Sequence, residues 1–162
     1  MPNPTAKTFT DPAALEAQRE TARALLARPL DVAVYREIRD LWKAHSIAED
    51  NRDLEGLIAT LTPDCVYEVV TSGHTWHGHD GARRFYTELL SAFPDVQFYL
   101  SNIVIGPQGV CEEATLVATH RADWQGLAAT GQKVELQVVI FFPWDPERKK
   151  FRGERVYVDR KR

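Results

Sequence analysis

The chain has 162 residues, of which 44% are hydrophobic and 27% charged, with a formal net charge of -3. This is ordinary globular composition, and a slightly acidic chain is a poor candidate for binding nucleic acid or an acidic membrane surface. No apolar run reaches the length of a membrane span, and the N-terminus lacks the basic and apolar segments of a secretory signal.

The first thirty residues predict one helix. Asp11 is a favourable N-cap and Pro12 suits the first turn, so a helix over residues 13–27 is expected, stopped by Pro29. Its apolar stripe is thin. We therefore expect residues 1–30 to form an extension that packs on the main body or on a second subunit, and residues 31–162 to form a single domain.

Three later helices are indicated by their apolar faces. The first is capped by Asp31, and its inward face has residues at three- and four-residue steps: Val34, Ile38, Leu41, Trp42, His45 and Ala48. A short helix starts at Asp53 and ends at Pro63. The last is capped by Asp80, and its buried face comprises Ala82, Phe85, Leu89, Leu90 and Phe93.

Strands make up most of the remaining chain. Residues 65–70 predict a first strand, and 71–81 predict a turn-rich segment. After Pro94 we expect strands over residues 96–105, 110–123 and 133–142, and a final strand over 153–159. Helices followed by long antiparallel strands predict an α+β fold, with the helices on one face of a curved sheet.

The final strand has two contrasting faces. Alternation places Arg155, Tyr157 and Asp159 together, and opposite them Glu154, Val156 and Val158. The polar face is either solvated or turned toward a cavity.

The two cysteines, Cys65 and Cys111, are isolated and lack CxxC spacing. Such thiols are typical of buried residues in a reducing compartment, so we expect a cytoplasmic protein.

The order of short motifs resembles a known family. They are Pro63-Asp64-Cys65-Val66-Tyr67, Gly78-His79-Asp80-Gly81, Phe93-Pro94-Asp95-Val96, Thr119-His120 with Trp124-Gln125-Gly126, Thr130-Gly131-Gln132-Lys133-Val134, and Glu154 through Tyr157 to Asp159. From about Asp31 to Asp159 the chain resembles the SnoaL-like polyketide cyclases, or ester cyclases, of the nuclear transport factor 2-like superfamily.

That resemblance implies a cone, in which a strongly curved antiparallel sheet wraps around N-terminal helices as a cystatin-like α+β barrel. It implies a homodimer, and a deep pocket for a small hydrophobic substrate. It also implies general acid–base catalysis without cofactor or metal, with an aspartate near the end of the last strand as base. Asp159 is the matching residue, and an apolar setting would raise its pKa toward neutrality.

His120, which shares a strand face with apolar neighbours, is a second catalytic candidate that could donate to a substrate carbonyl. It could equally be a hydrogen-bonded core residue. Pocket-lining candidates are His45, Trp42, Tyr67, Trp124, Phe142, Tyr157 and Arg155, with Phe98, Phe141 and Trp76 as further possible walls. Ordinary core packing is the other interpretation of these aromatic residues.

Three histidines in the turn-rich segment, His74, His77 and His79, invite a metal site, but no carboxylate spacing supports it. The leading function is deprotonation of an activated carbon, followed by aldol-type cyclisation, isomerisation or elimination on a hydrophobic oxygenated molecule. Two alternatives remain. One is epoxide hydrolysis of the limonene-epoxide-hydrolase type, using Arg155 and Asp159, and the other is a non-catalytic ligand-binding or dimerisation module.

Overall fold

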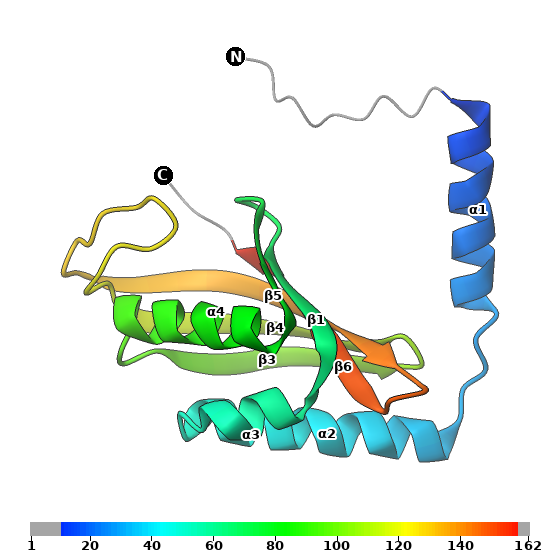
Figure 1. The fold of residues 1–162 in the computed structure, drawn as a ribbon, viewed down its shortest axis with the longest axis horizontal. Helices are drawn as coiled ribbons and strands as arrows, with labels where there is room; N and C mark the ends of the chain where they lie inside the picture. The colour runs from blue at the N-terminus through cyan, green and yellow to red at the C-terminus, as the bar shows by residue number, and fades with distance from the viewer. Residues whose placement is uncertain (1–10, 159–162) are drawn as a thin grey trace. The chain divides into compact units, whose positions relative to one another are not determined.

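The computed structural model describes residues 11–158 (Figure 1). The chain divides into two compact units, one ending at Leu30 and the other beginning at Asp31. The first unit contains helix α1 (Pro12–Leu26). Asp11 caps this helix by accepting a hydrogen bond from the Ala13 amide, as the sequence predicts.

The second unit begins with helices α2 (Val32–Asp50) and α3 (Leu54–Ala59). Asp31 caps α2 by accepting hydrogen bonds from two amides of its first turn. Asp53 caps α3 in the same way through the Gly56 amide. Each helix therefore starts where its capping aspartate predicts.

A six-stranded sheet follows. Its strands are β1 (Leu61–Val69), β2 (His74–His77), β3 (Gln97–Gly106), β4 (Gly109–Thr119), β5 (Lys133–Asp145) and β6 (Lys150–Val158), in the order β2-β1-β6-β5-β4-β3. The α+β class and the curved sheet are confirmed, and the sheet is open, with β2 and β3 at its edges. It is mixed rather than wholly antiparallel, because β1 runs parallel to β6.

Some boundaries differ from those predicted, for reasons of tertiary pairing. Pro63 lies within β1 instead of ending a helix, and β1 shifts register against β6 between Leu61 and Val66. The turn-rich segment contains the short strand β2, which pairs with β1. Helix α4 (Gly78–Ala92) therefore starts directly after His77 rather than at Asp80.

Helices α2 and α4 bury their apolar faces against the sheet. Helix α4 contacts β1 and β2, and α2 contacts β3 and β4; Figure 1 shows α4 passing across the strands and α2 running below them. The predicted inward residues belong to this core: Ile38, Phe85, Leu89 and Phe93 are buried, and Val34 and Leu41 pack against them. No helix within residues 11–158 is long and apolar enough to cross a membrane.

Strand β6 turns the opposite face inward from the one predicted. Glu154 is only 3% exposed, whereas Arg155 and Tyr157 are exposed. Arg155 binds Glu68 at 2.9 Å, with its guanidinium 5.9 Å from the ring centroid of Tyr157. The prediction that these two side chains face the cone is therefore wrong. Burial of the valines on the other face is favourable, and Glu154 is buried because it shares that face.

A bulge at Gly153 sets this orientation. Between the pairs Phe151–Trp144 and Arg155–Phe141, β6 has one residue more than β5, so Phe151 and Glu154 both point inward. Gly153 has φ +109°, and a Cβ there would lie 2.0 Å from the carbonyl oxygen of Val66. Only glycine fits this close approach of β6 to β1.

Candidate functional site

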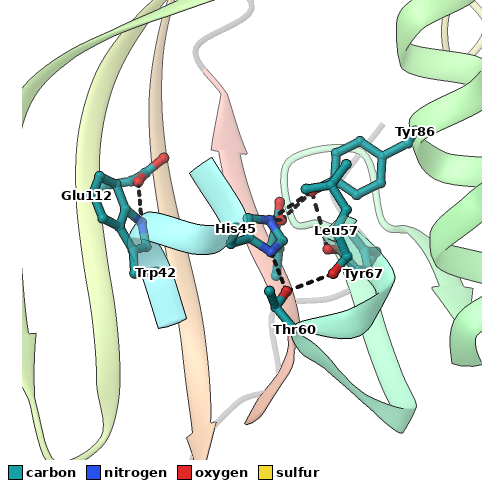
Figure 2. Close-up of polar contacts among 8 residues, drawn as sticks. Trp42, His45, Leu57, Thr60, Tyr67, Tyr86 and Glu112 are labelled. Atoms are coloured by element: carbon teal, nitrogen blue, oxygen red, sulfur yellow. Dashed lines mark hydrogen bonds and ion pairs between the residues drawn. The ribbon is translucent and has the colours of Figure 1, made fainter. Parts of the chain in front are cut away.

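A buried hydrogen-bond network centred on His45 links helices α2 and α4 to strands β1 and β6 (Figure 2). His45 Nε2 lies 3.0 Å from both Glu154 Oε1 and the Tyr86 hydroxyl, and Nδ1 lies 2.7 Å from the Thr60 hydroxyl. Tyr86 donates to Glu154 Oε1 at 2.7 Å, and the Tyr67 hydroxyl lies 3.2 Å from that of Tyr86. The network fixes the Glu154 carboxylate against α2 and α4.

The direction of these bonds places a proton between His45 and Glu154. The Thr60 hydroxyl donates to the Leu57 carbonyl, so it accepts from His45 Nδ1–H. Since Nδ1 carries a hydrogen, the contact between Nε2 and Oε1 needs a second proton.

Both tyrosines act as hydrogen-bond donors in this network. Burial, with the nearby charge of Glu154 as the second cause, raises the pKa of Tyr67 and of Tyr86 well above the usual range. The phenols consequently stay protonated.

An apolar cavity opens beside the network, between α4 and the inner face of the sheet. The space between its lining residues is about 520 Å³ when the open solvent at its mouth is counted. Among the described residues, its lining contains two carboxylates, Glu49 and Glu154, and otherwise only apolar side chains: Val69, Phe85, Leu89, Phe93, Phe98, Leu116, Trp124, Leu136, Val138, Ile140, Val156 and Val158. A hydrophobic cavity with a few convergent polar groups is the usual form of a small-molecule site.

Glu49 differs from Glu154 in that no hydrogen bond of the described chain holds its carboxylate. Glu49 lies on α2 one turn after His45. Desolvation raises its pKa well above the usual range, and the charges of Glu154, Glu112 and Asp50 raise it further against a smaller opposing effect of Arg52. A carboxyl group of raised pKa that lines an apolar cavity is typical of acid–base sites.

A second cavity lies on the other side of Glu49, between α2 and strands β3, β4 and β5. Its lining includes Trp42 and Glu112, whose indole Nε1–H donates to Oε2 at 2.8 Å. Figure 2 shows this pair apart from the His45 network. Desolvation, then Glu154, raises the pKa of Glu112 to about 7.

The structure distributes the predicted pocket residues among these features. Trp124 and Phe98 line the first cavity, and Trp42, His45, Phe98 and Phe142 line the second. Tyr67 lines neither and belongs to the hydrogen-bond network. Trp76 is a core residue whose indole donates to Glu88.

Of the two predicted catalytic residues, His120 lies within the described residues. Asp159 lies outside the described residues. His120 is buried and stacks on Phe93, with ring centroids 5.0 Å apart, and is absent from the linings of both cavities. Its Nε2 has no hydrogen-bond partner in residues 11–158.

The histidine cluster has no metal-binding geometry. His74 contacts the Ser72 hydroxyl, and His79 contacts the Leu61 carbonyl. Within the part of the chain that the structure describes, no three His, Cys, Asp or Glu side chains are arranged to hold a metal ion.

Sequence reasoning missed Glu49, Glu154, Tyr86 and Glu112. Glu49 follows Trp42 and His45 at seven and four residues, so helical spacing alone places it on their face. For Glu154 the signal was a carboxylate on the face that carries two valines. Glu112 carried no such signal, because its position depends on the pairing of β4 with β5 at Ile140, which the sequence does not reveal.

A family model agrees with this architecture. The model of the SnoaL-like polyketide cyclases matches residues 32–160. The chain belongs to this family. The match includes α2, the whole sheet and both cavities, and it begins after α1. No curated protein matches the chain.

Solved structures of the same fold share little sequence with this family member. AclR of Streptomyces galilaeus, for which a hydroxylase activity is suggested, is 23% identical with a TM-score of 0.62, over 77% of this chain and 90% of AclR. A suggested SnoaL-like polyketide cyclase of Jannaschia sp. CCS1 is 16% identical with a TM-score of 0.69, over 82% and 92%. A protein of unknown function from Burkholderia pseudomallei, described as NTF2-like, is 18% identical with a TM-score of 0.64, over 76% and 91%.

The raised pKa of Glu112 predicts a stability that falls with rising pH. An unfolded glutamate titrates near 4.5, so between about pH 4.5 and 7 the native state holds a proton that the unfolded chain has lost. The free energy of unfolding therefore decreases across this window and stays low above it. Glu112→Gln should flatten the decrease and stabilise the protein at pH 8 by on the order of 2–3 kcal/mol.

Urea unfolding at pH 5 and pH 8 measures this effect. Glu113→Gln is the matched control, because its exposed side chain has the same charge on the neighbouring position of β4. If the free energy of unfolding fell by the same amount between pH 5 and pH 8 in Glu112→Gln and Glu113→Gln, the assigned pKa would be wrong.

Proposed function

We propose that this protein is an enzyme that moves a proton on a hydrophobic, oxygenated small molecule and so promotes aldol-type cyclisation, isomerisation or elimination. The observation that carries the proposal is the apolar cavity whose polar lining consists of Glu49 and Glu154. As the family resemblance implies, the chemistry needs no cofactor. The enzyme would supply an apolar cavity and a carboxyl group of raised pKa.

Glu49 is the proposed proton-transfer group. A general base works best when its pKa lies near the working pH, and burial moves a glutamate in that direction. The ionised carboxylate removes a proton from the carbon next to a carbonyl, leaving an enolate. The protonated Glu49 then returns that proton to a different atom of the substrate, or to the oxygen of the leaving group, which restores the carboxylate.

Glu154 has a supporting electrostatic role in this proposal. Its Oε1 is held by His45 and Tyr86, so it stays in place while Glu49 changes charge. Its charge is the second cause of the raised pKa of Glu49, after desolvation.

The cavity chemistry also restricts the substrate. No Lys or Arg belongs to the described lining, and both carboxylates repel anions. A neutral hydrophobic ketone or ester fits better than a carboxylate or a phosphate ester. Trp124, Phe98 and Phe93 supply aromatic walls for a ring-bearing molecule.

Epoxide hydrolysis receives less support. That reaction would use Arg155 beside a carboxylate in the cavity, whereas Arg155 binds Glu68 on the outer face. Asp159 and His120 remain proposals that rest on the family resemblance and on the sequence, and the assay below tests Asp159 beside Glu49.

Glu49→Gln should abolish proton transfer while the protein stays folded. The assay incubates the protein in D₂O with a panel of neutral cyclic ketones and β-keto esters, and mass spectrometry follows deuterium incorporation next to the carbonyl. We expect wild-type protein to accelerate the exchange, and Glu49→Gln to slow it by about 10²–10⁴-fold. Glu113→Gln, the exposed control, should exchange like wild type.

Three outcomes oppose parts of the proposal. Unchanged exchange in Glu49→Gln removes Glu49 as the base. Loss of exchange in Asp159→Asn with full activity in Glu49→Gln assigns the base to Asp159. Binding of these compounds without any exchange supports the non-catalytic ligand-binding alternative.

We also propose a cytoplasmic homodimer that pairs through the outer face of the sheet. Val139 and Tyr157 are neighbours on β5 and β6 and are 38% and 40% exposed. Exposed apolar neighbours of this kind often mark an interface. Sedimentation equilibrium at micromolar concentration should give about twice the 18.4 kDa of one chain, and Val139→Glu should weaken the dimer. A wild-type mass of a single chain would contradict this pairing.

A further inference from the structure

The second cavity differs in character from the first. It encloses about 420 Å³ of empty space, including part of its opening to solvent. Three carboxylates line it, from Glu49, Asp50 and Glu112, beside three aromatic residues, Trp42, Phe98 and Phe142. No Lys or Arg belongs to its described lining. The remaining residues are His45, Ser46, Leu100 and Ala114.

Two of these carboxylates have oxygens to which no group of the described chain donates. Glu112 is only 8% exposed, and the Trp42 indole donates to its Oε2. Within residues 11–158, no protein group donates to Glu112 Oε1 or to the side-chain oxygens of the half-buried Glu49. These oxygens are not fully enclosed by the protein, so water or a bound ligand can donate to them through the cavity.

Neither His45 nor Arg52 donates to these oxygens. His45 uses its ring nitrogens on Glu154, Tyr86 and Thr60. Arg52 donates to the carbonyls of Glu49 and Val96 and does not line the cavity. A cation from outside the chain would therefore find the acceptors open.

The lining favours an organic cation over a metal ion. Among the described residues no three carboxylate, imidazole or thiolate side chains are arranged to hold a metal. The lining instead combines carboxylates with aromatic rings. Aromatic faces attract ammonium groups, and carboxylates accept hydrogen bonds from them.

We propose that the second cavity is a binding site for a small protonated organic amine, whose ammonium group donates to Glu112 and Glu49 beside Trp42. This site shares Glu49 with the proposed acid–base chemistry, but the binding of an amine does not depend on turnover. Because Glu49 lies between the two cavities, an amine bound here would also stabilise the ionised form of Glu49.

Binding should tighten as the pH rises from 5 to 8. Glu112 faces Glu49 and Asp50 from α2, Glu154 from β6, and the Trp42 indole, and its pKa of about 7 means that it is protonated at pH 5. A primary amine stays protonated across this range, so the change reports the ionisation of the carboxylates.

Benzylamine tests the site, with benzyl alcohol as the neutral analogue and benzoate as the anionic one. Titrations are followed by NMR of the indole N–H of Trp42, which Trp42→Phe assigns. At pH 8 we expect benzylamine to shift this signal and the two analogues to leave it unchanged. Glu112→Gln should weaken the binding of benzylamine by about tenfold or more, since the substitution removes a charge-assisted hydrogen bond. Glu113→Gln should bind like wild type.

Equal binding of benzylamine and benzyl alcohol would overturn the proposal, because it would show an apolar contact only. So would equal affinities in Glu112→Gln and Glu113→Gln, or no shift of the Trp42 signal. None of these results depends on deuterium exchange. The amine site can therefore be refuted while the proposed acid–base function stands, and the acid–base function can be refuted while the amine site stands.

Discussion

The Glu154 carboxylate lies inside the core, where an ionised group is stable only if hydrogen bonds replace its water. His45 from α2 and Tyr86 from α4 supply those bonds, while Thr60 and Tyr67 orient the donors. The same bonds join both helices to β6, an inner strand of the sheet. Removing one partner of such a buried pair typically costs about 3–5 kcal/mol, so this network holds the fold and the site together.

The position of Glu154 determines the electrostatics of the interior. Gly153 lets β6 bulge against Val66, which directs Glu154 inward. Its charge raises the pKa of both Glu49 and Glu112, in addition to their desolvation. Three carboxylates consequently share an interior with few cations. In the apolar cavity, we propose, Glu49 exchanges a proton with a neutral molecule. In the second cavity, Glu112 and Glu49 would bind a cation.

Local chemistry predicted much of the fold. The caps at Asp31 and Asp53 and the spacing of Ile38, Phe85 and Leu89 depend on near neighbours, and the structure has them as predicted. The orientation of β6 depends on pairing with strands far away in the sequence. Alternation predicts that Glu154 and Arg155 lie on opposite faces of β6, but it does not indicate which of the two faces is buried. Glu49 was overlooked because apolar periodicity disregards a charged residue, even one that lies on the buried side of its helix.

The central claim is that the buried acidic interior shifts the titration of Glu49. NMR titration of its side-chain carboxyl carbon, in wild type and in Glu154→Gln, measures this directly. Wild-type Glu49 should titrate well above the ordinary 4.5, and its pKa should fall when the charge of Glu154 is removed. A wild-type Glu49 that titrates near 4.5 would contradict the account, because its carboxyl would then be an ordinary solvated group.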